Sequence, residues 1–232
     1  MALGLWRPPH GWREFAGEVG IIVIGVLIAL GAEQLVNTAH WRQQVETFRQ
    51  AVHSELAENL GTYEYRAKWN GCVKRRLDEL EAWLESWHNG QPRMLIQPIG
   101  APKFLSLSTS AWESRDAILV SHMPMRERMM IGGLYDDFDN NEIHRLDERE
   151  TWLALGEFDG AVNLDSRDLM RLRGLISRAR FRDQRMTFNA LIFFRDSQVL
   201  GIVAQQDADY PSNDPSFCTS LFGGDKVNHP AS

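Results

Sequence analysis

The hydrophobic positions of the chain are concentrated in one stretch near the N-terminus, from Phe15 to Val36, which reads FAGEVGIIVIGVLIALGAEQLV. Its centre, from Val19 to Ala32, is an uninterrupted run of uncharged residues that are all aliphatic, Gly or Ala. As a helix, residues 15–36 would rise about 33 Å, close to the roughly 30 Å of a bilayer's hydrocarbon core. The pattern therefore predicts an N-terminal tail at 1–14 and a transmembrane helix at 15–36.

Two other interpretations of this segment are open. The small residues of Ala29-Leu30-Gly31 would suit cleavage of a secretory signal, but Glu14 and Glu18 lie where a signal peptide carries positive charge. A buried helix of a soluble domain would have a polar face, and residues 19–32 provide none. An anchor that stays attached is therefore the favoured interpretation.

The orientation of this anchor follows only in part from its flanking charges. Arg7 and Arg13 precede the span, and Arg42 and Arg49 follow it, so that the count of positive residues is nearly balanced. A following domain of about 195 residues can be translocated despite its own charges. We expect the short tail to lie inside and the domain outside the cytoplasm, in the periplasm of a Gram-negative cell.

Beyond the anchor, residues 37–203 repeat apolar positions at the three- and four-residue spacing of amphipathic helices. The first set continues the membrane helix, with no Pro or Gly to interrupt it, through Val45, Phe48, Val52, Leu56 and Leu60. A second helix is predicted from about residue 63 to 88, with apolar positions at Val73, Leu77, Leu80, Leu84 and Trp87. It should end at Asn89-Gly90-Gln91-Pro92, because Gly suits a left-handed cap and Pro cannot continue a helix.

A proline-rich loop is predicted after this second helix, at residues 89–107. Within it, residues 96–99 could lie extended across the bundle, although Pro98 is unfavourable in a strand. Ser110 and Glu113 then match a capping box, which predicts a short third helix to about residue 120.

Two longer helices complete the prediction. Pro124 suits the first turn of a fourth helix that runs to about residue 158. Asp165 and Asp168 open a fifth helix that ends near Gly201, and the tail at 204–232 is irregular unless Cys218 fixes it. The expected fold class is all-α, with the N-terminal transmembrane helix continuing into an antiparallel helical bundle of about five helices.

Composition narrows the possible partners and the compartment. The net charge of −6 argues against a general nucleic-acid binder. Cys72 and Cys218 are the two cysteines, and in an exported domain they could form a disulfide that closes a loop of nearly 150 residues. Loop-closure entropy gives such a bond about 4–5 kcal/mol. In a cytosolic domain the same residues would be two separate buried thiols.

The acidic residues of the fourth helix resemble a calcium loop in their spacing. Asp137, Asp139, Asn141 and Glu148 match ligand positions 1, 3, 5 and 12 of such a loop. The sixth position, which needs Gly for a sharp turn, is occupied by Glu142. A solvated acidic face of the fourth helix is the alternative, and we expect no metal, no cofactor and no catalytic residue.

The fifth helix is strongly basic, with seven arginines at positions 167, 171, 173, 178, 180, 182 and 185. These side chains could pair with acidic residues across the bundle, among them Glu55, Glu58, Asp78, Glu79, Glu81 and Glu85. The alternative is a surface that binds anions or lipid headgroups. Paired or solvated arginines are the favoured interpretation.

Within the predicted span, Gly25 and Ala29 lie four residues apart, and Ala32 extends the same small face. Small residues at this spacing let two membrane helices approach closely. The expected partners are therefore the lipid bilayer, a second copy through the anchor, and a further protein that the sequence does not identify.

The chain resembles a family of uncharacterised proteobacterial single-pass membrane proteins. The resemblance rests on Glu18 followed by the GVLIAL sequence of 25–30 and by Glu33-Gln34, and on three further segments: 72–80, 110–114 and 134–136. The resemblance covers most of the chain, and its motifs are structural. The resemblance implies a location and a fold, and no activity, substrate or catalytic residue.

The function expected from these features is that of a membrane-anchored interaction or scaffold protein. The alternative is a periplasmic small-molecule sensor or binding domain, in which Trp69, Trp83, Trp87, Trp112 and Trp152 could line a pocket. We do not expect an enzyme, because no nucleophile–base pair or phosphate-binding loop is recognisable.

Overall fold

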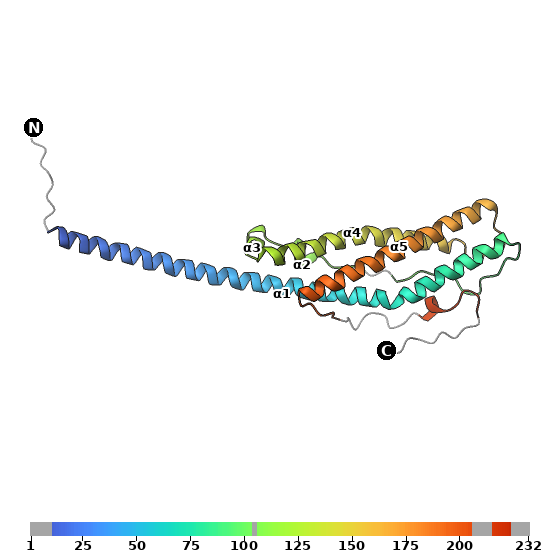
Figure 1. Ribbon diagram of the computed structural model, residues 1–232, viewed down its shortest axis with the longest axis horizontal. Coiled ribbons are helices and arrows are strands. Elements are labelled where there is room, and N and C mark those ends of the chain that lie inside the picture. The colour runs from blue at the N-terminus through green and yellow to red at the C-terminus, as the bar shows by residue number, and fades with distance from the viewer. Residues whose placement is uncertain (1–10, 104–105, 206–214, 224–232) are drawn as a thin grey trace, which may run out of the picture. The chain divides into compact units, whose positions relative to one another are not determined.

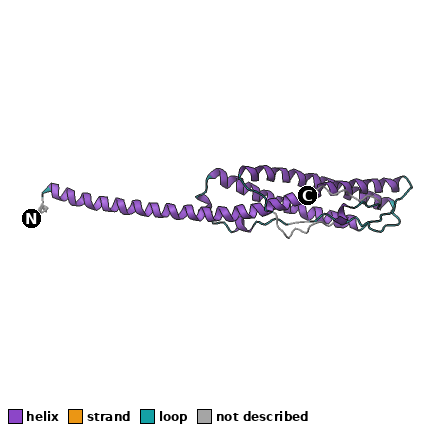
Figure 2. Ribbon diagram, turned by 90° about the horizontal axis from the view of Figure 1, so that it is seen from below, coloured by secondary structure: helices purple, strands orange, loops and turns teal. Residues whose placement is uncertain are grey.

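The computed structural model describes residues 11–103, 106–205 and 215–223. These residues form the helices α1 (Trp12–His88), α2 (Ser110–Glu113), α3 (Ala117–Ser121), α4 (Met125–Gly156) and α5 (Ser166–Val199), followed by a short 3₁₀ helix, η1 (Pro215–Cys218). No strand occurs in this described part (Figure 2). The expected all-α class is therefore confirmed.

The chain divides into two compact units. The first comprises residues 1–49 with 116–123, and the second comprises residues 50–115 with 124–232. Helix α1 contributes residues to both.

Helix α1 is one continuous helix, so the prediction of two helices separated near residue 61 is wrong. An isolated Gly such as Gly61 costs a helix only about 1 kcal/mol, and burial of the flanking apolar residues outweighs that cost. Leu56 and Leu60 before this point, and Val73 beyond it, are all buried.

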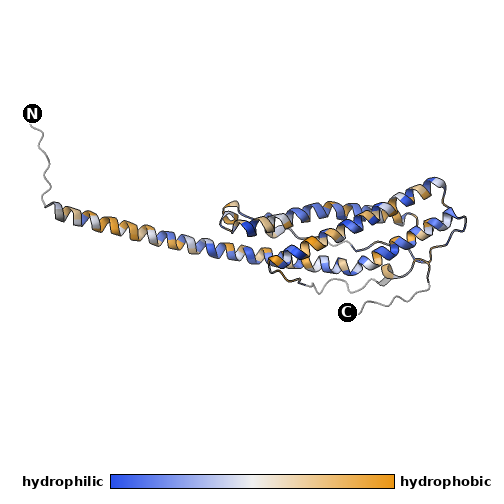
Figure 3. Ribbon diagram, viewed as in Figure 1, coloured by the Kyte–Doolittle hydropathy of each residue, from blue (hydrophilic) through white to orange (hydrophobic). Residues whose placement is uncertain are grey.

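The first unit contains the apolar part of α1. Figure 3 shows this part of the helix as predominantly hydrophobic. An 18-residue window within it has a mean hydropathy of 2.3, and none of that window is buried within the protein. The helix is thus long and apolar enough to cross a membrane. In the same unit, the rings of Trp41 and His122 stack with centroids 4.3 Å apart.

The second unit is a helical bundle in which α4 and α5 form an antiparallel hairpin, lying side by side in Figures 1 and 2. The predicted start of α5 is confirmed, because Asp165 and Asp168 form a reciprocal capping box. The helix ends before Gly201, whose φ of 70° suits the left-handed conformation that glycine adopts without strain.

The loop after α1 runs back along the bundle and determines the direction of α4. The backbone N–H of Ile99 donates to Asp159 at one end of the bundle, whereas that of Ser108 donates to Asn59 on α1. Helix α4 consequently runs in the same direction as α1, and α5 is antiparallel to both. A long return segment, instead of a tight turn, produces this arrangement.

The predicted third helix is replaced by two short helices, α2 and α3. The capping box expected at Ser110 is not formed, because the Ser110 hydroxyl donates to Glu55 on α1. Thr109 is the residue at the N-cap, and its hydroxyl donates to Glu113 over 2.6 Å. Packing against Glu55 has therefore taken precedence over local capping.

The core of the bundle lies between the distal part of α1, the C-terminal half of α4 and the N-terminal half of α5. Among its fully buried residues are Leu77, Leu80, Trp83, Ile99, Trp152, Leu155, Leu172 and Leu221. Ile99 from the return loop and Leu221 from the C-terminal segment contribute to the same core. The two irregular segments are therefore packed parts of the fold.

Candidate functional site

The residues predicted to resemble a calcium loop lie within helix α4 and do not converge. At about 100° and 1.5 Å per residue, Asp139 lies on the opposite side of the helix from Asp137, and Glu148 lies about 16 Å farther along the axis than Asp137. Among the described residues, no group of three or more acidic, His or Cys side chains could hold a metal ion. These four residues therefore do not form the calcium loop that their spacing resembles. The alternative of a solvated face is only partly right, since Asn141 and Glu148 are buried.

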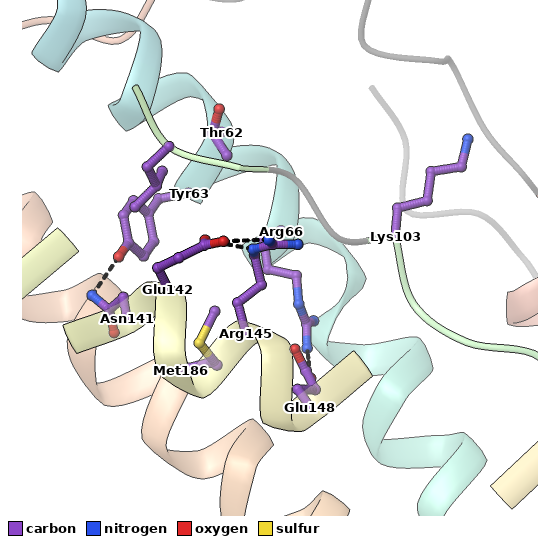
Figure 4. Close-up of a pocket in the computed structure, with 10 residues that line it drawn as sticks. Thr62, Tyr63, Arg66, Lys103, Asn141, Glu142, Arg145, Glu148 and Met186 are labelled. Atoms are coloured by element: carbon purple, nitrogen blue, oxygen red, sulfur yellow. Dashed lines mark hydrogen bonds and ion pairs between the residues drawn. The ribbon is translucent and has the colours of Figure 1, made fainter. Parts of the chain in front are cut away.

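These two buried residues instead line a small cavity in the second unit (Figure 4). The cavity has a volume of about 30 Å³ and lies where α1, α4, α5 and the return loop meet. Its lining is Thr62, Tyr63, Arg66, Lys103, Leu107, Asn141, Glu142, Arg145, Glu148 and Met186. Such a volume is sufficient for a water-sized molecule.

Arg66 of α1 is the central residue of this cavity. One Nη atom donates to Glu148 of α4 over 2.8 Å and approaches Asp183 of α5 at 3.5 Å. The other Nη donates over 2.9 Å to Asn70, whose amide in turn donates to Thr187 of α5 over 3.1 Å. A single guanidinium thus connects three helices through charge-assisted hydrogen bonds.

The two carboxylates next to Arg66, those of Glu148 and Asp183, have higher pKa values than exposed carboxylates do. Burial raises the pKa of Glu148 above its ordinary value, although the positive charge of Arg66 opposes this shift. The pKa of Asp183 is raised for the same reason and is opposed by the same guanidinium. For both carboxylates, the cost of removing the charged form from water therefore outweighs its attraction to the Arg66 guanidinium.

The hydrogen bonding of the cluster is incomplete among the described residues. The Oε2 atom of Glu148 and the Nε atom of Arg66 are both buried without a partner of ordinary hydrogen-bond geometry. The indole N–H of Trp152, one turn along α4, is also buried without such a partner. Its proximity lowers the pKa of Glu148, but less than the other causes do. A small polar molecule in the cavity could satisfy such groups.

A second polar row extends along the bundle from the cavity. Asn141 donates to the hydroxyl of Tyr63 over 2.6 Å and accepts a hydrogen bond from Asn189. Burial raises the pKa of Tyr63 well above its ordinary value, and the charge of Asp137 adds to the effect. Tyr63 therefore remains a neutral phenol at physiological pH.

The mouth of the cavity carries charged side chains of both signs. Arg145 pairs with Glu142 one turn earlier on α4, and Lys103 projects from the return loop (Figure 4). None of the described lining residues is a Ser, Cys or His that could act as a nucleophile or as a base near neutral pH. The arrangement is suited to binding a small polar group.

A second buried carboxylate, Glu55, fixes α2 to the bundle. It accepts hydrogen bonds from the hydroxyls of Ser108, Ser110 and Tyr135 and from the backbone N–H of Ala111, at 2.7–2.9 Å. Burial by itself would raise the pKa of Glu55, but these four donors outweigh it and lower that pKa. Ser110 was interpreted from the sequence as part of a capping box, so this cluster was missed.

Cys72 and Cys218 form a disulfide that attaches the C-terminal segment to α1, with their Cα atoms 5.0 Å apart. The buried Arg76, one turn along α1, donates to the backbone carbonyls of Phe217 and Thr219 over 2.8 and 3.0 Å. The carboxylate of Glu79 accepts the backbone N–H of Leu221 over 3.0 Å. Residues 215–223 are therefore held by a covalent bond and by polar contacts from one face of α1.

The arginines of α5 are partly paired, as the sequence suggested. Arg180 bridges Asp78 and Glu81 of α1 over 2.9 and 2.8 Å, and Arg182 pairs with Asp147 of α4. Exposed arginines at positions 167, 178 and 185 take part in no ion pair within the described residues.

The tryptophans proposed for a ligand pocket do not line the cavity. Trp83 and Trp152 are fully buried in the core, and Trp112 stacks on Tyr135 with ring centroids 5.4 Å apart. Trp69 and Trp87 pack against the same core. Three of the five are buried and two are partly buried, and all of them pack as structural side chains instead of lining this cavity.

The small face predicted within residues 15–36 is exposed. Gly25, Ala29 and Ala32 all lie on the surface of α1, and a Cβ added at Gly25 would meet no atom within 4 Å. The surface is open for a neighbouring helix, and pairing through it stays a prediction.

Comparison with known proteins identifies no relative of this chain. No protein-family model matches the chain, and no curated protein and no solved structure is significantly similar to it.

Proposed function

We propose that this chain is a single-pass inner-membrane protein whose helical domain lies in the periplasm and serves as an interaction or scaffold module. We also propose that the chain belongs to the family of uncharacterised proteobacterial single-pass membrane proteins whose anchor and helix motifs it shares. The domain would present helical surfaces to other proteins at the membrane, and no chemical reaction is assigned to it.

The exposed apolar part of α1 is the observation that carries this proposal. Large aliphatic side chains such as Ile21, Ile22, Leu27 and Ile28 are each more than half exposed, on all sides of the helix. Keeping such a surface in water costs about 25 cal/mol of free energy per Å² of exposed apolar area. A bilayer accommodates it, and the polar groups of its backbone are satisfied within the helix.

The periplasmic location is supported by the disulfide. Disulfides persist in oxidising compartments and are rare in the reducing cytosol. The bond between Cys72 and Cys218 lies in the second unit, within the domain that would be exported. This agrees with an anchor whose short N-terminal tail stays inside.

A topology experiment tests this proposal. Alkaline phosphatase and GFP would be fused in turn after Ser232, and cells would be fractionated and washed with carbonate. We expect active phosphatase and dark GFP in the carbonate-resistant membrane fraction. Fluorescent GFP would overturn the periplasmic location, and active phosphatase in the soluble periplasm would overturn the anchor.

The cavity around Arg66 supports a second candidate function, a sensor or binding domain for a small polar molecule. The supporting observation is the pair of buried atoms without partners, Glu148 Oε2 and Arg66 Nε. A ligand that donates to Glu148 Oε2 and accepts from the N–H of Arg66 Nε would complete both hydrogen bonds.

Tryptophan fluorescence tests this second function, because Trp152 lies one helical turn from Glu148. The full-length protein in detergent would be titrated with glycine, formate and urea. A saturable change that is lost in Glu148→Gln but kept in the exposed control Glu150→Gln is expected for a binding site. No saturable change with any of the three would count against it.

A further inference from the structure

Helix α5 has an apolar surface on its outward side that no described residue covers. Large apolar side chains at Met170, Phe181, Phe188, Leu191 and Val199 are between 56% and 69% exposed. At 100° per residue these positions fall within an arc of about 80°, so that they form one continuous row. We call this row the α5 surface.

Positive charge borders the α5 surface along its side nearer α4. Arg167, Arg178 and Arg185 lie within about 60° of Phe181 on the helix and are all exposed. The described residues provide none of these three with an ion pair. A second α5 surface could not pack against this one without bringing like charges together.

Helix α4 has an outward surface of the same construction and the opposite charge. Met125, Met129, Ile143, Leu146 and Leu153 are between 44% and 66% exposed and fall within an arc of about 120°. Exposed carboxylates lie within that arc, at Asp136, Asp139 and Glu150, and outnumber its one cation, the half-buried Arg128. We call this row the α4 surface.

The two surfaces match each other in length as well as in charge. The α4 surface spans residues 125–153, about 42 Å of helix, and the α5 surface spans residues 170–199, about 43 Å. Within one chain both surfaces face outward, so their complementarity can be satisfied only between molecules. Amphipathic helices of opposite charge are a common basis for such pairing.

We propose that a second copy of this chain packs its α4 surface against the α5 surface of the first. This inference rests on the proposed interaction function and names the partner. A symmetric pair would bury both surfaces twice. Anionic lipid headgroups suit this arrangement less well, because they would attract the α5 surface and repel the α4 surface.

Membrane anchoring would favour the pairing. Two copies confined to one bilayer meet at a higher effective concentration than two soluble domains do. Even a weak contact between helix surfaces can then hold a substantial fraction of the molecules in pairs. Each copy contributes one α4 surface and one α5 surface to the pair.

A charge-exchange experiment on the full-length protein in membranes tests this inference. Copies with two different tags would be co-expressed, solubilised in mild detergent and purified through one tag. Variant A carries Arg178→Glu and Arg185→Glu, and variant B carries Asp139→Arg and Glu150→Arg. Each variant with itself should show at least about a tenfold loss of co-purification, because like charges now face each other.

Co-expression of variant A with variant B is the decisive test. In this mixture every α4 surface of one partner meets an α5 surface of opposite charge on the other, so co-purification should return to the wild-type level. Recovery also shows that both variants are folded. Failure to recover, with both variants retaining the wild-type circular dichroism spectrum, would overturn the pairing.

A matched control reverses two exposed cations of α1, Arg42→Glu with Lys68→Glu, which belong to neither surface. This control changes the net charge as much as variant A and should leave co-purification unchanged. Undiminished co-purification of variants A and B with themselves would place the contact elsewhere and overturn the inference. The topology experiment is independent of all these arms, so failure of the pairing and failure of the anchored, exported location are distinguishable.

Discussion

At the scale of single residues, Arg66 links the three main helices of the bundle. Its guanidinium contacts Glu148 of α4, Asp183 of α5 and Asn70 of its own helix. Buried ion pairs of this kind add little net stability, because desolvation offsets the attraction, but removing one partner leaves an uncompensated charge. The cluster therefore makes the packing of the three helices sensitive to single substitutions.

We predict that Arg66→Met lowers the free energy of unfolding by about 3–5 kcal/mol, because Glu148 is left buried and unpaired. The double variant Arg66→Met with Glu148→Met should recover most of that loss. Urea denaturation of the full-length protein in detergent, followed by circular dichroism, measures both. A double variant as unstable as the sum of its two single variants would contradict the coupling of these residues.

Glu55 provides a prediction for pH dependence. Its pKa is lowered in the folded protein, since its four donors outweigh the effect of burial. An unfolded Glu has a pKa of about 4.3, so the stabilisation is complete above that pH and is lost as the pH falls through the lower folded-state pKa. Glu55→Gln should therefore cost about 1–3 kcal/mol at pH 7 and progressively less below pH 4.

Urea denaturation of wild-type and Glu55→Gln protein from pH 3 to 7 measures this difference. The exposed Glu85→Gln, farther along α1, serves as the control for a change of net charge alone. A penalty for Glu55→Gln that stays constant down to pH 3 would contradict the account of this carboxylate.

The residue-scale contacts were the least accessible from the sequence. Nothing in the spacing of Arg66, Glu148 and Asp183 indicates that they meet, because they lie on three helices whose relative rotation depends on tertiary packing. The calcium-like spacing was misleading for a related reason, since linear spacing indicates a loop only where the backbone is not helical. The disulfide was simpler, because two cysteines allow only one intramolecular pairing.

At the scale of secondary-structure elements, local signals were good predictors of helix ends and poor predictors of helix continuity. Asp165 with Asp168, Gly90 and Gly201 each mark an end that the structure contains, because caps are determined by a few adjacent residues. The continuity of α1 through Gly61 depends on packing along the whole helix, which no short window contains. The splitting of the third helix likewise depends on Glu55, more than fifty residues away in the sequence.

The capping box of α5 leads to a quantitative prediction. Asp165 accepts the backbone N–H groups of Arg167 and Asp168 over 2.7 and 2.9 Å. Asp165→Ala should lower the free energy of unfolding by about 1 kcal/mol, whereas Ser166→Ala, inside the first turn, should change it by only a few tenths. Equal effects in urea denaturation would contradict the role of the cap.

The anchor can be tested as an element by placing a charge at two depths. Leu27 lies near the middle of the predicted span, where an Arg costs about 2.5–3.5 kcal/mol of insertion free energy. Leu27→Arg should therefore shift protein from the carbonate-resistant fraction to the soluble fraction. Leu35→Arg should have little effect, because a side chain near the end of the span can reach the interface. Equal retention of both variants would contradict a membrane-spanning helix.

At the scale of the whole molecule, the chain combines an apolar helix, a disulfide-closed bundle and two surfaces of opposite charge. The all-α class and the apolar helix could be predicted from hydrophobic periodicity alone. The α4 and α5 surfaces could not, since the same periodicity describes the buried and the exposed sides of a helix until its neighbours are placed.

The redox state of Cys72 and Cys218 in intact cells tests the central claim, an anchored domain in an oxidising compartment, most directly. Cells would be quenched with acid, and the denatured membrane fraction would be labelled with a polyethylene-glycol maleimide before and after reduction. The account predicts no mobility shift before reduction and a shift of two labels after it, with Cys72→Ser as the one-label standard. Labelling of both thiols without reductant would contradict the periplasmic location of the domain.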